Sequence, residues 1–212
     1  MGRYIEAKCR RCRRAMEKLF LKGDRCATAK CGLVRRASIP GVHGKNKTSK
    51  SGISEYGMQL MAKQKIKRIY GILERQFRKH FDEVKNRPGI TGDLLLARLE
   101  LRLDNAVYRI NFASSRSQAR QIVNHGLIMV NGRRVNIPSF AVKVGDVISI
   151  NPFKKEKNYF KNLSQVLKNK TNFPNWISFN KENLEGKIVN IPTKRDSGID
   201  VDIQMVVEYY SR

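Results

Sequence analysis

The chain has 212 residues, of which 43 are lysine or arginine and 18 are aspartate or glutamate, so its formal net charge at pH 7 is +25. So large a positive charge favours a polyanionic partner, which relieves the self-repulsion. No apolar run approaches the roughly 20 residues that span a bilayer, and no signal-peptide core follows Met1, so we expect a soluble cytoplasmic protein without a membrane partner.

The N-terminal part of the chain is strongly basic, and its first 31 residues hold every cysteine of the chain in a C-x2-C-x13-C-x4-C pattern. A reducing cytoplasm disfavours disulfides, so clustered cysteines indicate a metal. Structural zinc can order a segment that lacks a hydrophobic core, through roughly 10–16 kcal/mol of apparent binding energy. An iron–sulfur cluster and unmetallated thiols remain the alternatives. The predicted zinc ligands are Cys9, Cys12, Cys26 and Cys31.

A polar, lysine-bearing loop over 45–53 follows, and we expect it to be disordered without RNA. The segment 54–84 then places apolar residues such as Ile66 and Phe77 at helical spacing, between a capping serine and Pro88-Gly89. Two or more helices are predicted there. Their opposite face is lysine-rich and arginine-rich, which on its own predicts only a solvated face.

Two helical segments come next, over 94–112 and from Ser115 to Gly126. Ser115 can cap the second one while Gln118 reaches back to the amide of the cap. Arg116 and Arg120 lie one turn apart opposite an apolar side, so we expect a cationic face beside a helix N-terminus, which attracts phosphate.

The remaining chain predicts strands. Asn131-Gly132 can turn a hairpin, and 142–150 predicts a further strand with a turn at 144–146. A lysine-rich helix is predicted over 154–170, and short strands over 186–192 and 199–210. Trp176 is interpreted as a packing residue rather than a base-stacking platform.

Several motifs of the central region resemble a small RNA-binding module. They are Arg102-Leu103-Asp104-Asn105, Tyr108-Arg109, Ser115-Arg116, Ala119-Arg120-Gln121, His125-Gly126 and Val130-Asn131-Gly132-Arg133. Bacterial small-subunit ribosomal protein four, pseudouridine synthases and tyrosyl-tRNA synthetases share this module.

The rest of the chain favours the first of these families. The N-terminal segments Cys9 to Arg14, Leu19 to Gly23 and Pro40 to Gly44, and the tail Val207 to Arg212, resemble the zinc-bearing form of ribosomal protein four. That resemblance implies an α+β fold with a basic zinc-binding arm over 1–44. A mostly helical domain over 45–98 would be completed by 173–212, and a module of two helices and a hairpin sheet, with the lysine-rich helix, would be inserted over 99–172.

The resemblance also implies a function: a structural, non-enzymatic constituent of the small ribosomal subunit that binds ribosomal RNA early, at a helix junction, and influences decoding accuracy. Implied partners are small-subunit ribosomal RNA, messenger RNA near its entry channel and ribosomal protein five, with no small-molecule substrate. The residues expected to contact RNA are Arg3, Arg10, Arg11, Arg13, Arg14, Lys22, Arg35, Arg36, His43, Lys45, Lys47, Lys50, Lys63, Lys65, Lys67, Arg68, Arg75, Arg78, Arg102, Arg109, Ser115, Arg116, Arg120, Gln121, His125, Asn131, Arg133, Arg134 and Lys143.

Two other classes of protein are alternatives to this interpretation. An RNA-modifying enzyme or a synthetase would need a catalytic domain beside the module, but the sequence has no nucleotide-binding glycine loop and no convincing acid–base pair. A zinc-dependent nucleic-acid-binding regulator outside the ribosome would need a recognition helix and usually a dimer seam.

Overall fold

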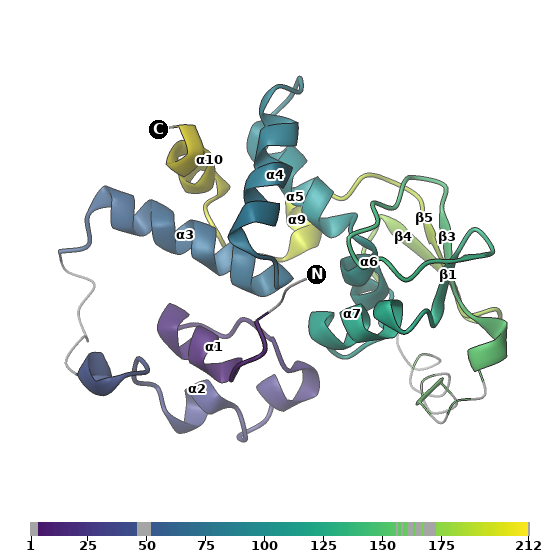
Figure 1. Ribbon diagram of the computed structural model, residues 1–212, viewed down its shortest axis with the longest axis horizontal. Helices are drawn as coiled ribbons and strands as arrows, with labels where there is room; N and C mark the ends of the chain where they lie inside the picture. The colour runs from purple at the N-terminus through teal and green to yellow at the C-terminus, as the bar shows by residue number, and fades with distance from the viewer. Residues whose placement is uncertain are drawn as a thin grey trace. The chain divides into compact units, whose positions relative to one another are not determined.

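The computed structural model describes residues 4–45, 52–155, 157, 159–160, 163, 167 and 173–211. The chain forms two compact units (Figure 1). Unit 1 comprises Met1–Leu95 and Asp200–Arg212, and unit 2 comprises Leu96–Ile199. Unit 2 is therefore one continuous segment inserted into unit 1, which is completed by the last residues of the chain.

Unit 1 begins with the cysteine-bearing arm, which is built from short helices. These are α1 (Cys9–Ala15), the 3₁₀ helix η1 (Gly23–Cys26), α2 (Gly32–Arg35) and the 3₁₀ helix η2 (Val42–Lys45). Its buried apolar groups are Leu19 and three of the cysteines. So small an apolar interior is typical of a segment that needs a further source of stability.

The larger part of unit 1 is helical: α3 (Glu55–Tyr70), α4 (Glu74–Lys85), the first half of α5 (Thr91–Glu100) and the returning α10 (Ile203–Ser211). The second half of α5, from Leu96 onward, belongs to unit 2. The predicted helices over 54–84 are confirmed. Ser54 caps α3 by accepting the Gly57 N–H, and Gly71 ends it at a φ of 65°. Phe81 and Tyr210 stack with 4.7 Å between ring centroids, so α10 belongs to the core of unit 1.

Unit 2 combines helices with a five-stranded antiparallel sheet in the order β2-β1-β3-β5-β4. Its helices are α6 (Leu103–Arg109), α7 (Arg116–Asn124) and α9 (Lys194–Ser197). Its strands are β1 (Ile128–Val130), β2 (Arg133–Arg134), β3 (Val147–Ile150), β4 (Ile177–Asn180) and β5 (Glu185–Ile188), and the short 3₁₀ helix η3 (Pro152–Lys154) follows β3.

The interior of unit 2 joins the helices to the sheet. Val107 and Ile122 from the helices pack in one cluster with Ile128 and Ile148 from the strands, together with Trp176. The interpretation of Trp176 as a packing residue is confirmed, because it is 1% exposed. Asn131 and Gly132 turn the predicted hairpin at φ values of 50° and 74°.

The helical segment predicted over 94–112 is interrupted, which corrects one expectation. The backbone at Arg102 is extended, and Leu103 N–H donates to the Phe140 carbonyl while Val142 N–H donates to the Leu101 carbonyl. Pairing with a distant loop therefore replaces helical hydrogen bonds at this point, and separate helices α5 and α6 result.

The C-terminal strands were also predicted wrongly in part. Residues 203–211 form helix α10, because Asp202 accepts the Gln204 N–H near its start and Ile203 and Val206, one turn apart, are both buried. By contrast, β4 and β5 lie in the sheet of unit 2, so the segment 173–199 belongs with the module rather than with the helical domain.

The strand predicted over 142–150 begins only at Val147, after its turn. The lysine-rich helix predicted over 154–170 falls mostly outside the described residues, although Phe160 and Leu167 are buried in unit 2. Within the part of the chain that the structure describes, no helix has the length and apolarity needed to cross a membrane.

Candidate nucleic-acid interface and cysteine cluster

Helix α7 begins with the predicted serine cap. Ser115 Oγ accepts the Gln118 N–H at 3.4 Å, but the Gln118 side chain bonds to Ser114 rather than to the amide of Ser115. Ala119, Ile122 and Val123 form the buried side, as predicted. The positive end of the dipole of this nine-residue helix therefore lies beside Arg116.

Arg120 does not share the exposed face that the sequence predicted for it. It is 6% exposed, and its Nη1 lies 3.5 Å from Asp104 Oδ2. Arg102 is 2% exposed and donates two hydrogen bonds to the same carboxylate, at 3.1 and 2.9 Å. Both guanidinium groups are therefore part of the interior of unit 2, where Asp104 offsets their charge.

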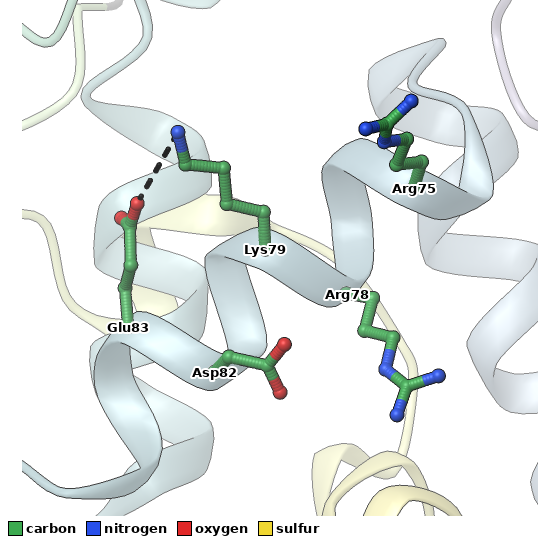
Figure 2. Close-up of a pocket in the computed structure, with 5 residues that line it drawn as sticks. All are labelled: Arg75, Arg78, Lys79, Asp82 and Glu83. Carbon is green, nitrogen blue, oxygen red and sulfur yellow. Dashed lines mark ion pairs between the residues drawn. The ribbon is translucent and has the colours of Figure 1, made fainter.

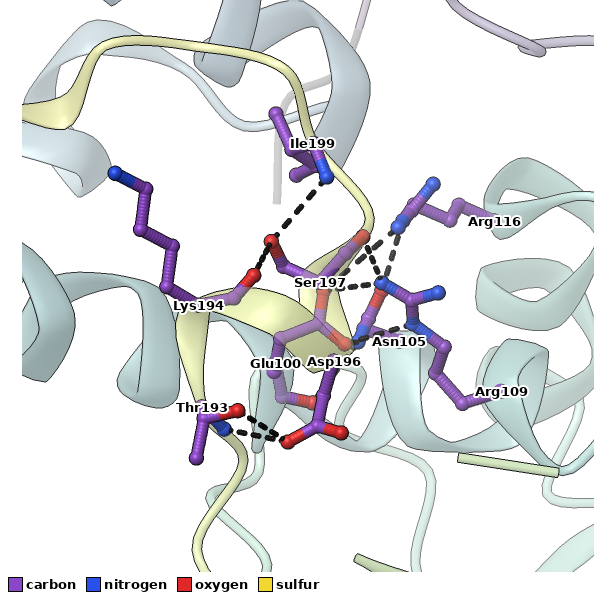
Figure 3. Close-up of polar contacts among 9 residues, drawn as sticks. All are labelled: Glu100, Asn105, Arg109, Arg116, Thr193, Lys194, Asp196, Ser197 and Ile199. Carbon is purple, nitrogen blue, oxygen red and sulfur yellow. Dashed lines mark hydrogen bonds and ion pairs between the residues drawn. The ribbon is translucent and has the colours of Figure 1, made fainter. Parts of the chain in front are cut away.

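Arg109 and Arg116 gather around a second buried carboxylate, that of Glu100 (Figure 3). Arg109 donates to both Glu100 oxygens at 2.8 and 2.7 Å and to the Ser197 carbonyl at 2.6 Å. Arg116 donates to Asn105 Oδ1 at 2.7 Å. Sequence reasoning missed Glu100, because a glutamate at the end of an amphipathic helix gives no sign that tertiary contacts enclose it.

The hairpin presents an exposed basic edge. Asn131 holds the turn to β3: it donates to Asp146 and accepts the Val147 N–H, each at 2.8 Å. Arg133 and Arg134 are exposed, and the Arg134 guanidinium lies against Gly126, where an added Cβ would come within 2.2 Å of its Nε. The end of α7 therefore lies beside the hairpin. Other expected contact residues exposed in this unit are Gln121, His125 and Lys143.

On α3, the expected RNA-contacting lysines are engaged in ion pairs. Lys63 is 3% exposed and lies 2.8 Å from Glu74, and Lys67 lies 2.7 Å from the other Glu74 oxygen. Lys65 pairs with Glu17 of the arm. Burial alone would raise the pKa of Glu74, but hydrogen bonds from Lys63, Lys67 and Tyr210 outweigh it and lower this pKa to about 2.

Helix α4 carries its basic residues on the surface. Arg75 and Arg78 line an open hollow of about 390 Å³ together with Lys79, Asp82 and Glu83 (Figure 2). Figure 2 shows both guanidinium groups directed away from the ion pair that joins Lys79 to Glu83 at 4.0 Å.

The arm adds arginines near α3. Arg11 stacks over the Tyr4 ring at 3.7 Å, and burial lowers the pKa of Arg68, which the charges of Arg11 and Arg14 lower further. Arg13 donates to the Ser38 carbonyl at 2.9 Å, and Arg10 lies 3.5 Å from Glu6. Arg14, Lys22, Arg35 and Arg36 are exposed. The predicted contacts at Arg3, Lys47 and Lys50, and at the side chains of His43 and Lys45, lie outside the described residues.

The four cysteines line one small pocket of the arm as free thiols. Lys22 N–H donates to Cys26 Sγ at 3.3 Å, and backbone hydrogen bonds from Leu33 and Val34 lower the pKa of Cys31. Gly32 approaches Cys9 so closely that an added Cβ would lie 3.0 Å from its Sγ. Among the described residues, no group of three or more histidine, cysteine, aspartate or glutamate side chains has a geometry that would hold a metal ion.

Comparison with known proteins places these features in a family. Residues 3–100 match the ribosomal protein S4/S9 N-terminal domain, and residues 101–148 match the S4 domain. The fold and the basic surface are thus those of an S4-domain RNA-binding protein.

Relatives that match over the full length of the chain identify the family within this class of RNA-binding proteins. Proteins from Halothermothrix orenii and Syntrophomonas wolfei are each 50% identical to this chain over 212 residues, 100% of both chains, and one from Clostridium tetani is 49% identical over the same span. Each bears the name small ribosomal subunit protein uS4. The chain belongs to the ribosomal protein uS4 family, a family of ribosomal structural proteins rather than enzymes.

Proposed function

We propose that this protein binds small-subunit ribosomal RNA at a helix junction and nucleates assembly of the small ribosomal subunit there. The observation that carries the proposal is the full-length match to small ribosomal subunit proteins, in a chain with a formal charge of +25. A-form grooves hide base edges from side chains, so arginine contacts to phosphates and 2′-hydroxyls would supply most of the affinity.

The proposed contact surface of unit 2 runs along α7 to the hairpin, from Arg116 to Arg133 and Arg134. A charge-to-neutral change on this surface tests it. Replacing Arg133 with alanine should weaken binding to purified small-subunit ribosomal RNA and reduce the slope of log affinity against log salt by about 1. Lys187→Ala, an exposed change on β5, is the matched control and should leave the slope nearly unchanged. Equal slopes for the two variants would contradict the proposed surface.

Finer contacts are proposed on the family resemblance. Lys45, Lys47 and Lys50 would contact messenger RNA near its entry channel, with an influence on decoding accuracy, and the C-terminal strands β4 and β5 would contact ribosomal protein five. Cross-linking in small subunits that carry a photoreactive residue at Lys47 or Ser178 tests each contact separately. Labelling of ribosomal RNA alone at the first position, or of no protein at the second, would contradict them.

We further propose that the arm binds one zinc ion through Cys9, Cys12, Cys26 and Cys31. The donor set supports it: four thiols share one pocket, and backbone N–H groups point at two of the sulfurs, which favours thiolates. Zinc, when bound, supplies a tetrahedral thiolate link between segments of the arm. The cysteines would hold the ion, and nearby arginines would offset the excess negative charge.

Native mass spectrometry and metal analysis test the zinc proposal. The protein should carry one zinc ion, and Cys9→Ser should lose it while unit 2 stays folded. Ala27→Ser, which adds a hydroxyl beside Cys26 without removing a thiol, should keep the ion. Stoichiometric iron with visible absorbance, or equal zinc content in the two variants, would contradict the proposal.

A further inference from the structure

Glu100 is the most enclosed acidic residue of the network in Figure 3. Its side chain is 0% exposed. Its Oε2 accepts hydrogen bonds from Asn105 Nδ2, at 2.8 Å, and from Arg109 Nε. Its Oε1 accepts a hydrogen bond from Arg109 Nη2. Arg116 Nη2 lies 3.9 Å from that second oxygen. A buried carboxylate with this many donors is held in one orientation.

The two arginines around Glu100 have different further contacts. Arg109 is bound through the same guanidinium to the Ser197 carbonyl, so it ties the end of α9 to α6. Arg116 is held from three sides: by the Glu100 charge, by the hydrogen bond from its Nε to Asn105, and by the Tyr108 ring, 4.6 Å below its guanidinium. Arg109 thus joins elements, whereas Arg116 is fixed beside the N-terminus of α7.

Fixing a long side chain before binding matters energetically. An arginine that is free to rotate loses rotamer entropy on binding, and this loss weakens its net contribution to affinity. Two guanidinium groups that share one site also repel each other unless an anion lies between them. Glu100 supplies that anion and orients Arg116 at the same time.

We propose that Glu100 is a positioning residue for RNA binding: it holds Arg116 in the orientation that meets a phosphate at the start of α7. This inference rests on the proposed RNA-binding surface of α7 and the hairpin. Glu100 itself does not touch the RNA, and its effect runs through Asn105 and Arg116.

The direction in which Glu100→Gln changes RNA affinity distinguishes a positioning role from long-range electrostatics. Glu100→Gln removes a negative charge from a strongly cationic protein, so long-range electrostatics alone predicts tighter RNA binding. Positioning predicts weaker binding, because both carboxylate oxygens face N–H donors and the new NH₂ group must oppose one of them. We expect the dissociation constant for purified small-subunit ribosomal RNA to rise about fivefold, the order expected when one charge-assisted contact is weakened.

The matched control is Glu182→Gln, which makes the same charge change at an exposed position of the same unit. It should bind RNA as tightly as the unchanged protein or slightly more tightly. In an Arg116→Ala background, Glu100→Gln should have no further effect on the dissociation constant. Glu100→Gln behaving like Glu182→Gln would overturn the inference.

Arg116→Lys keeps the test decisive if Glu100→Gln does not fold. The lysine keeps the charge but lacks the Nε–H that binds Asn105 and the planar group that stacks on Tyr108. Positioning predicts weaker RNA binding, and affinity equal to that of the unchanged protein would contradict it. If Arg116→Ala leaves RNA affinity unchanged, the proposed RNA-binding surface is contradicted at this residue. If Arg116→Ala weakens binding but Glu100→Gln and Arg116→Lys do not, the surface is supported and only the positioning role of Glu100 is contradicted.

Discussion

At the scale of residues, the charge of a side chain and its accessibility are separate properties in this protein. Arg102, Arg120 and Lys63 have the residue type expected of RNA contacts, yet each is under 7% exposed beside a carboxylate. Sequence alone predicted their type but not their burial, because the partner carboxylate is brought to them by the fold. Arg133 and Arg134, which follow the hairpin turn, were also expected to contact RNA, and both are exposed.

Asp104 carries the charge balance of two buried arginines. Asp104→Asn removes the negative charge that both buried guanidinium groups contact, and we expect the free energy of unfolding to fall by about 3–5 kcal/mol. Urea unfolding followed by circular dichroism measures it. Asp82→Asn, on the surface of α4, should change it by less than about 0.5 kcal/mol. A loss at Asp104 no larger than that would show that the buried group is not an ion pair in solution.

Glu74 makes part of the stability depend on pH. Folding lowers its pKa from the ordinary value of 4.5 to about 2, so its contribution to stability is fully present above pH 4.5 and is lost as the pH drops toward 2. Unfolding of the protein and of Glu74→Gln should therefore differ most near neutral pH, and the difference should shrink between pH 4.5 and 2. A constant difference over that range would contradict the lowered pKa.

At the scale of elements, local signals and long-range pairing account for different parts of the fold. Helices α3, α4 and α7 and the Asn131-Gly132 hairpin were predicted, because periodicity, caps and turn residues are local. The break before α6 and the helical form of α10 were not, because they depend on a loop and on helices far along the chain. Likewise, the sequence pattern predicted a strand near β5 but not the sheet that it joins, and it did not predict β4.

Gly186 permits the sheet to meet α6. An added Cβ would lie 2.6 Å from Ile110 Cδ1 and 2.8 Å from its Cγ1, and both residues are buried. Gly186→Ala should lower the free energy of unfolding by about 1–3 kcal/mol through overpacking. Ser178→Ala, on the exposed side of the neighbouring strand, is the control and should have little effect. Equal thermal unfolding of the two variants would show that α6 can move away at no cost.

At the scale of the whole molecule, the net charge predicts a binding free energy that depends strongly on salt. If about ten phosphates are neutralised, RNA affinity should fall by roughly 10³–10⁵-fold between 50 and 200 mM salt, by analogy with DNA. Filter binding over this range measures the slope. Competition with duplex DNA at fixed salt is the control for specificity, and a preference for DNA would contradict recognition of folded RNA.

The insertion of unit 2 within unit 1 also determines the order in which the two units can be completed in the nascent chain. Translation proceeds from the N-terminus, so every segment of unit 2 is made before α10. Until α10 emerges, Phe81 lacks its stacked partner Tyr210, and Glu74 lacks one of its three hydrogen-bond donors. The helix synthesised last therefore closes the compact unit that was begun first.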